Sequence, residues 1–307
     1  MRIKTLALGS AAALLALLGP ATQARQAQPA APALAAAPGQ RVATPALWKV
    51  SDKDTTIYLF GTIHLLPEGI DWYNGKLASA FESTQELVTE IPDIPPGEAA
   101  ALSLRMGTLP PGQSLRSGMT ADQLAKYEGA MKSLGLPVSA FDRLKPWFAA
   151  VAMATLPLQK AGYSMDNGIE AQLDRRNKEL GRPRLGLETL EYQLSLFDGL
   201  PEPVQRKYLF DVIDAVPTIP QEIGKMVDAW VKGDAEQLAV LLNSETDDPA
   251  LYEALLTRRN ENWAVWIDNR LDQPGVVFIA VGAGHLAGKD SVQELLRKQK
   301  IKAVRVQ

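Results

Sequence analysis

The sequence of 307 residues predicts an α/β fold with a central, mostly β core, and three observations support this. Strand, helix and strand patterns follow one another between residues 47 and 91. The same alternation returns between residues 276 and 306. Almost all of the chain between these two regions has the 3.6-residue periodicity of helices. Because alternating strands and helices are typical of α/β proteins, we expect both ends of the folded chain to build one core around a large helical insertion.

The first 24 residues have the three parts of a secretory signal peptide. Arg2 and Lys4 make a basic start, an apolar run covers residues 6–18, and small residues at 22–24 resemble a cleavage site. The run is shorter than the about 20 residues that a membrane span needs, so no span is expected after cleavage. An uncleaved N-terminal anchor is the alternative. The pattern predicts a periplasmic or secreted protein.

Composition limits the chemistry that is open to the chain. The absence of cysteine excludes a lipid anchor on cysteine, disulfides, thiolate metal ligands and a cysteine nucleophile. Residues 25–44 are rich in Ala, Pro and Gln and have no apolar periodicity, so they predict a flexible linker that precedes one domain at 45–307. The formal net charge is −3 and no basic block is present, so we expect no nucleic-acid partner.

The first α/β unit begins with a predicted β-hairpin. Its strands are the apolar stretches 47–50 and 55–60, and the polar sequence Ser-Asp-Lys-Asp between them is typical of a turn. Residues 75–86 have a helical pattern with one apolar side. The short β-branched stretch 87–91 then predicts another strand, which stops at a proline.

The insertion is predicted to form helices in two stretches, about 97–180 and 190–270, with a short buried strand at 184–187 between them. Thr120 is the expected N-cap of one helix. Residues 145–162 are apolar all round, which is typical of a buried helix or of the wall of a groove.

The C-terminal region returns to α/β order. Residues 276–281 form an apolar stretch that predicts a buried strand. A helix is expected at 289–299, with Asp290 as its N-cap. Residues 302–306 predict a last strand.

The two histidines of the chain occupy the same local frame. "YLFGTIH" ends at His64 and "IAVGAGH" ends at His285, and each is an apolar strand followed by Gly, two further residues and His. Ligands of α/β sheets bind beyond the carboxyl ends of the strands, so the two imidazoles converge if their strands are neighbours. For either histidine alone, a buried imidazole bound by the backbone is the simpler interpretation. The repeated frame favours a functional site.

Charged residues that could complete such a site also stand at strand ends. Glu90 ends "ELVTEI" and Glu188 ends "RLGLE", where a solvated surface carboxylate is less expected. Arg258 and Arg259 lie on a predicted helix, and one of them could face inward to bind a carboxylate or a developing anion. A charged outer helix face is the alternative.

Five stretches together resemble the TraB/GumN proteins, which are bacterial relatives of the Tiki metalloproteases. They are "WKVSDKDTTIYLFGTIHLLPEG", "ELVTEI", "GLETLEYQL", "RRNENWA" and "VFIAVGAGHLAGKDSVQELLRKQ". The resemblance covers about 47–306 and implies the fold of the wider erythromycin-esterase/ChaN-like group, an α/β core with a helical insertion that forms a cleft. It also implies a metal site with His64, Glu90 and His285 as ligands, whereas the esterase-like relatives have no firm metal. Glu188 and Arg259 match the further motifs "GLET" and "RN".

Three functions follow as hypotheses. The first is a hydrolase, a divalent-metal-dependent peptidase using Mn²⁺, Co²⁺ or Zn²⁺, in which Glu188 or Glu90 takes a proton from water and Arg259 stabilises the oxyanion. The second is a metal-free esterase or amidase, in which His64 activates water, Glu90 orients it, and His285 with Arg259 binds the tetrahedral anion. The third is a non-catalytic periplasmic protein that binds a peptide or a signal. The expected ligand is a peptide or a small ester or amide.

Overall fold

The computed structural model describes residues 41–243 and 249–307. The predicted signal peptide and most of the predicted linker lie outside the described residues. The last four linker positions, 41–44, belong to the fold, because β1 (Arg41–Val42) pairs with β4 (Ile70–Asp71) and Ala43 is fully buried. Within the described ranges, no helix combines the length and the apolar character of a membrane span.

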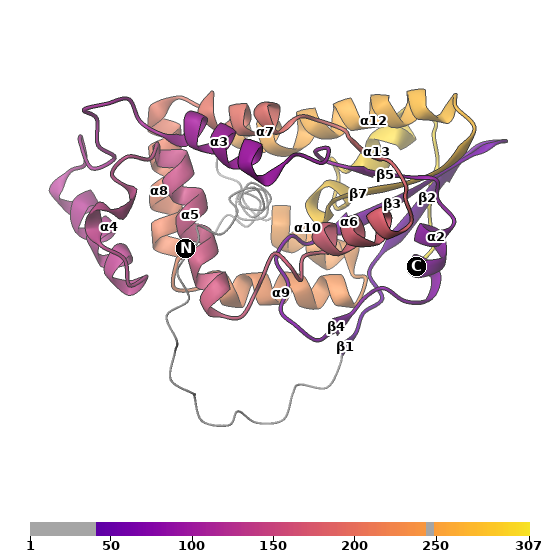
Figure 1. Cartoon of the computed structure of the whole chain (residues 1–307), viewed down its shortest axis with the longest axis horizontal. Coiled ribbons are helices and arrows are strands. Elements are labelled where there is room, and N and C mark those ends of the chain that lie inside the picture. The colour runs from indigo at the N-terminus through magenta and orange to yellow at the C-terminus, as the bar shows by residue number, and fades with distance from the viewer. Residues whose placement is uncertain (1–40, 244–248) are drawn as a thin grey trace.

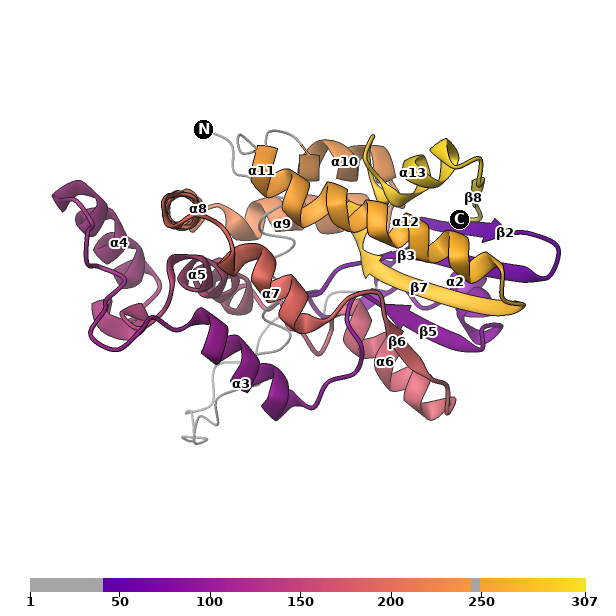
Figure 2. The ribbon, with the colours of Figure 1, turned by 90° about the horizontal axis from the view of Figure 1, so that it is seen from above.

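The core is a six-stranded mixed sheet (Figure 1), and the order of its strands is β6-β5-β7-β3-β2-β8 (Figure 2). The strands are β2 (Leu47–Ser51), β3 (Thr55–Thr62), β5 (Glu86–Thr89), β6 (Arg184–Gly186), β7 (Gly275–Gly282) and β8 (Ala303–Arg305). The first four in this order run parallel, and β2 is antiparallel to both of its neighbours. The predicted hairpin is therefore confirmed. Strand β7, from the C-terminal region, lies between two strands from the N-terminal region, as expected for one core built from both ends.

Helices cover both faces of this sheet, which explains why its central strands β5, β7 and β3 are buried at most positions. Helices α12 (Arg258–Leu271) and α13 (Val292–Lys298) lie on one side of the sheet, and α6 (Ile169–Glu179) lies on the other (Figure 2). Alternate residues of β3 belong to two separate hydrophobic cores. Ile57 lies in the core that α12 and α13 cover, and Phe60 lies in the core on the opposite face of the sheet, which α6 covers. The second face also carries α2 (Gly75–Glu82), the helix that the sequence predicts there.

The helical part extends from the end of the sheet at which the parallel strands finish (Figure 2). Its helices are α3 (Pro96–Gly107), α4 (Ala121–Ser133), α5 (Pro146–Lys160), α7 (Leu190–Asp198), α8 (Glu202–Ala215), α9 (Ile219–Val231), α10 (Ala235–Asn243) and α11 (Pro249–Tyr252). Thr120 caps α4 through a reciprocal pair of hydrogen bonds with Gln123, as predicted. Helix α5 is buried along most of its length, and Trp147 and Phe148 pack in the core.

Two local predictions were wrong. The strand predicted at 184–187 exists as β6, but it lies at the edge of the sheet and pairs, within the described part of the chain, only with β5, so Leu185 is 42% exposed. The N-cap of α13 is Ser291, whose hydroxyl accepts from the Glu294 amide, and it is not Asp290. The Asp290 carboxylate instead accepts a hydrogen bond from the Tyr252 hydroxyl at 3.1 Å.

Candidate active site

Three of the predicted site residues follow the carboxyl ends of three adjacent parallel strands. Strand β7 pairs with β3 on one side, with Thr62 opposite Gly282, and with β5 on the other side. His64 comes two residues after β3, Glu90 directly after β5 and His285 three residues after β7. The strands are therefore neighbours, and the expectation that the two histidine frames converge is confirmed.

Gly282 marks the point at which these side chains meet. A Cβ atom added there would lie 3.1 Å from Glu90 Oε1, 3.6 Å from His285 Cδ2 and 3.8 Å from His64 Nε2. The Gly282 amide also donates to Glu90 Oε1 at 2.8 Å. The glycine of the second frame thus permits close approach of the site's side chains rather than an unusual backbone conformation, since its φ is −50°.

Arg259 lies at the centre of the cluster, and the protein supplies hydrogen-bond partners for Nε, Nη1 and Nη2. Nε donates to Glu188 at 3.0 and 3.1 Å. Nη1 donates to the Leu255 carbonyl and contacts His285 Nε2, both at 3.1 Å. Nη2 contacts Glu90 Oε2 at 2.7 Å and Glu188 Oε2 at 3.0 Å. With two carboxylates, an imidazole and a backbone carbonyl around a guanidinium that is only 4% exposed, the contacts of Arg259 favour a positioning role.

The other candidate arginine points away. The Arg258 side chain is 58% exposed and pairs with Glu253, whereas Arg259 is 4% exposed. Glu188 is equally buried, and besides Arg259 it accepts from Trp263 Nε1 at 3.0 Å and from Gln193 Nε2 at 3.1 Å. The inward-facing arginine is thus the one that the family motif indicates.

Glu90 stays ionised in this surrounding. Burial by itself raises the pKa of the Glu90 carboxyl, but the Arg259 guanidinium, the two imidazoles and the Gly282 amide together hold that pKa well below its usual range. Its Oε2 also accepts from Gln193 at 2.9 Å. A carboxylate that is ionised and multiply bonded is a weak proton acceptor, which argues against Glu90 as the general base.

His285 is held neutral. Burial and the neighbouring Arg259 lower the pKa of His285 to about 3. Its Nδ1 lies 2.6 Å from Asn260 Oδ1, an acceptor, so the proton is assigned to Nδ1 and Nε2 accepts from Arg259. The ring also packs on Trp263 at a centroid distance of 4.3 Å. His285 is therefore a fixed, uncharged part of the network.

His64 lies beside a carboxylate, whereas His285 lies beside a guanidinium. Its Nδ1 lies 2.7 Å from Glu170 Oε1, and Thr62 donates its hydroxyl proton to the same oxygen. Burial lowers the pKa of His64, but the charges of Glu170 and Glu90 and the Glu170 hydrogen bond outweigh it, so that the pKa is raised overall. The His64 side chain is 13% exposed, against 4% to 10% for Arg259, Glu188, Glu90 and His285. With Nδ1 donating to Glu170, Nε2 carries the lone pair of a general base.

The same contacts decide how well the side chains fit a metal ion. Among the described residues, no group of three or more His, Cys, Asp or Glu side chains is arranged to hold one. The guanidinium of Arg259 forms hydrogen bonds with His285 Nε2 and with Glu90 Oε2, so two of the three expected ligands already have a partner. The positive charge of Arg259 also repels a divalent cation at this place. The side chains as they stand do not fit the predicted ion. Whether the protein binds a metal remains a prediction.

Comparison with known proteins places the chain in a family. A sequence model of the TraB/PrgY/gumN family matches residues 46–305. The chain belongs to this family. It is 24% identical over 240 residues to the uncharacterized protein YbaP of Escherichia coli K12, over 78% of this chain and 87% of YbaP. An uncharacterized protein of Treponema pallidum is 24% identical over 277 residues, covering 83% of this chain and 80% of that protein. No solved structure matches the chain significantly.

Within this candidate site, several contacts were not predicted from the sequence. Glu170 stands in the first turn of the amphipathic helix α6, where nothing distinguishes it from a solvated residue. Asn260 directly follows Arg259, but its bond to His285 depends on the orientation of α12. Gln193 links Glu90 and Glu188 from α7. Its place on the buried face of that helix is the only available signal.

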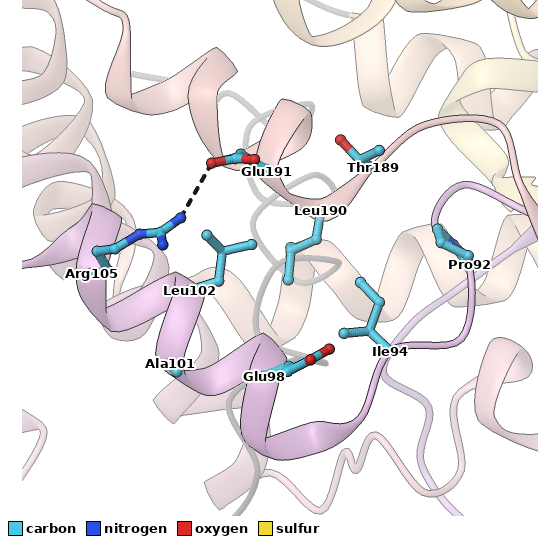
Figure 3. A pocket seen from close by; sticks show the side chains of 9 residues that line it. All are labelled: Pro92, Ile94, Glu98, Ala101, Leu102, Arg105, Thr189, Leu190 and Glu191. Carbon is cyan, nitrogen blue, oxygen red and sulfur yellow. Dashed lines mark hydrogen bonds and ion pairs between the residues drawn. The ribbon is translucent and has the colours of Figure 1, made fainter.

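A pocket opens beside the buried acid residues. Its volume is about 530 Å³ and it lies between α3, the loop that precedes α3 and the first turn of α7 (Figure 3). It contains none of the residues described above, but it includes Pro92, two positions after Glu90, and Thr189, directly after Glu188. The lining residues are Pro92, Ile94, Glu98, Ala101, Leu102, Arg105, Thr189, Leu190 and Glu191.

Proposed function

We infer that this TraB-family protein is a hydrolase that cleaves a peptide bond or a small ester or amide, with His64 as its general base. The observation that carries this proposal is the pair formed by His64 and Glu170, with Nδ1 and the carboxylate 2.7 Å apart. A carboxylate that fixes the tautomer of a histidine and stabilises its protonated form is a recurring device of hydrolytic enzymes. The pair lies at the carboxyl ends of the parallel strands, where ligands of such sheets bind.

The reaction needs one water molecule as nucleophile. His64 Nε2 takes a proton from water while the water oxygen forms a bond to the carbonyl carbon of the substrate, and Glu170 stabilises the imidazolium that results. The tetrahedral intermediate then breaks the bond to the leaving amine or alcohol. The same imidazolium returns its proton to that leaving group, so protons and electrons balance.

The remaining residues hold this base in place. Glu90 adds a fixed negative charge that favours protonated His64, and Arg259 keeps Glu90 ionised. The neutral ring of His285 accepts a hydrogen bond from Arg259. These three therefore act as positioning residues in the proposed mechanism. The base at His64 is that of the metal-free hypothesis, but the roles expected there for Glu90, His285 and Arg259 are replaced by positioning.

The test uses the purified chain without its first 24 residues and a panel of internally quenched peptides and nitrophenyl esters. We expect hydrolysis that survives removal of divalent ions by a chelator and that falls by about 10²- to 10⁴-fold in His64→Ala. Arg258→Ala, on the exposed side of α12, is the matched control and should keep full activity. Turnover that depends on one bound metal ion would support the metal-dependent peptidase instead.

Absence of turnover across the panel, together with tight peptide binding that His64→Ala does not change, would support the non-catalytic binding protein. The periplasmic or secreted location is part of the proposal. It predicts that N-terminal sequencing of the exported protein finds a start close to residue 25.

A further inference from the structure

The pocket beside α3 has a mostly apolar interior and a charged edge. Ile94, Leu102 and Leu190 point into it from three different segments (Figure 3). Arg105 pairs with Glu191 at 3.2 Å, and both of these side chains are about two-thirds exposed. A cavity of a few hundred Å³ with apolar walls and few polar groups is the usual form of a ligand site.

One charge of the pocket has no counterpart among the described residues. Glu98, in the first turn of α3, forms no ion pair with any described residue, whereas the charges of Arg105 and Glu191 neutralise each other. The edge therefore carries one unbalanced negative charge next to an apolar interior. The complementary ligand has an apolar side chain and a cation close to it.

Two chain segments contribute residues both to the pocket and to the candidate active site. The backbone amide of Glu188 donates to the Glu90 carbonyl at 2.8 Å, so these two residues lie side by side at the end of the sheet. One segment continues into Pro92 and Ile94, and the other continues into Thr189 and α7. Both segments line the pocket within a few residues of the acid network.

We propose that this pocket is a subsite for a peptide substrate and takes an apolar side chain whose neighbour in the peptide is Lys or Arg. The proposal rests on the hydrolase function inferred above and names its substrate class. Ile94 and Leu102 contact the apolar side chain, and Glu98 pairs with the basic neighbour. The subsite selects the peptide, and the bond is cleaved at His64.

Four fluorescein-labelled hexapeptides test the subsite, identical except for two adjacent residues: Leu-Lys, Asp-Lys, Leu-Glu or Asp-Glu. Binding is measured by fluorescence anisotropy on the chain with His64→Ala, so that bound peptide is not consumed. We expect Leu-Lys to bind about tenfold or more tightly than Asp-Lys, because one apolar side chain in a pocket gives discrimination of that order. Leu-Glu should also bind more weakly than Leu-Lys.

Variants of the pocket assign the preference to its walls. Leu102→Asp and Ala101→Trp, which fills the cavity from an exposed position, should each abolish the Leu preference. Glu98→Lys should reverse the Lys preference. Leu104→Asp is the matched control, since Leu104 lies on α3 outside the pocket and is 51% exposed. Circular dichroism melting checks that each variant is folded.

Equal binding of all four peptides, or a preference that survives both Leu102→Asp and Ala101→Trp, would overturn the subsite. So would loss of the preference in Leu104→Asp. Failure of the proposed hydrolase function is a separate result. Selective binding through the pocket, without any turnover by the protein that retains His64, would refute the catalytic proposal alone. Turnover that ignores the pocket variants sinks the subsite alone.

Discussion

At the scale of single residues, the two histidines show that an identical frame does not imply an identical role. His64 faces a carboxylate, and its pKa is raised although burial opposes this. His285 faces an amide oxygen and a guanidinium, and its pKa falls to about 3. Their partners come from α6 and α12, far from either Gly-x-x-His frame. The chemistry of each imidazole is therefore set by helices that the frame does not include.

Glu170→Gln should lower the pKa of His64, because a neutral amide cannot stabilise the imidazolium. The acid limb of the pH profile of kcat/KM should then move to lower pH, and the rate should fall about tenfold or more. NMR titration of the imidazole measures the same pKa without any substrate. Glu179→Gln, at the exposed end of the same helix, is the control. An unchanged His64 titration in Glu170→Gln would contradict the pairing.

Arg259→Ala should convert the cluster into a metal site. Removal of the guanidinium frees Glu90, Glu188 and His285, and leaves two buried carboxylates without a cation, which costs about 3–5 kcal/mol of stability. Added Co²⁺ or Mn²⁺ should then raise the melting temperature of this variant and bind at one equivalent. The protein without substitutions and the Arg258→Ala variant should show neither effect. Stoichiometric metal in the original protein that is lost in Arg259→Ala would refute this account.

At the scale of elements, the sequence predicts the six strands of the main sheet and the helical character of the insertion, because their apolar periodicity is strong, but it misses the short strands β1 and β4. It also predicts that Glu90 and the two histidines stand at strand ends, since Gly and polar residues follow apolar runs there. Glu170 could not be predicted, because its role depends on α6 crossing the end of β3. The exposure of Leu185 could not be predicted either, since edge and inner strands of similar composition differ only in their neighbours.

The close contact between α6 and the chain at His64 leads to a prediction for Gly168, the N-cap of α6. A Cβ atom at Gly168 would lie 2.1 Å from the His64 carbonyl oxygen, so Gly168→Ala must push the start of α6 away. The Glu170–His64 pair should separate, and hydrolysis should fall with a lower melting temperature. Gly129→Ala in α4 is the matched control, because nothing lies within 4 Å of its Cβ position. It should leave activity unchanged and add up to about 1 kcal/mol of stability.

At the scale of the whole molecule, the buried imidazole of His285 couples folding to pH. Its pKa is about 3 in the folded protein and 6.5 in its ordinary state, so between these values the unfolded chain binds a proton that the folded chain does not. Stability should therefore fall as pH drops from about 6.5 towards 3. Glu90 acts in the same direction below its ordinary pKa of 4.5, because its folded pKa is lowered.

His64 acts oppositely, because its raised pKa gives stability at low pH that is lost as pH rises through its folded value. Urea unfolding between pH 4 and 7 measures the balance. The slope of the unfolding free energy against pH should be smaller in His285→Gln than in the original protein. An identical slope would show that His285 is not buried as a neutral ring.

The central position of β7 has a consequence for the order in which the chain is made. This strand joins β5 to β3, and it arrives only with residues 275–282, after most of the polypeptide has left the ribosome. Until then the two earlier strands have no shared partner, and His64 and Glu90 have no common neighbour in Gly282. Pairings this distant in sequence form slowly, so the nascent chain stays loosely folded until its C-terminus arrives. A chain that matures this late carries no finished candidate site while it is being synthesised.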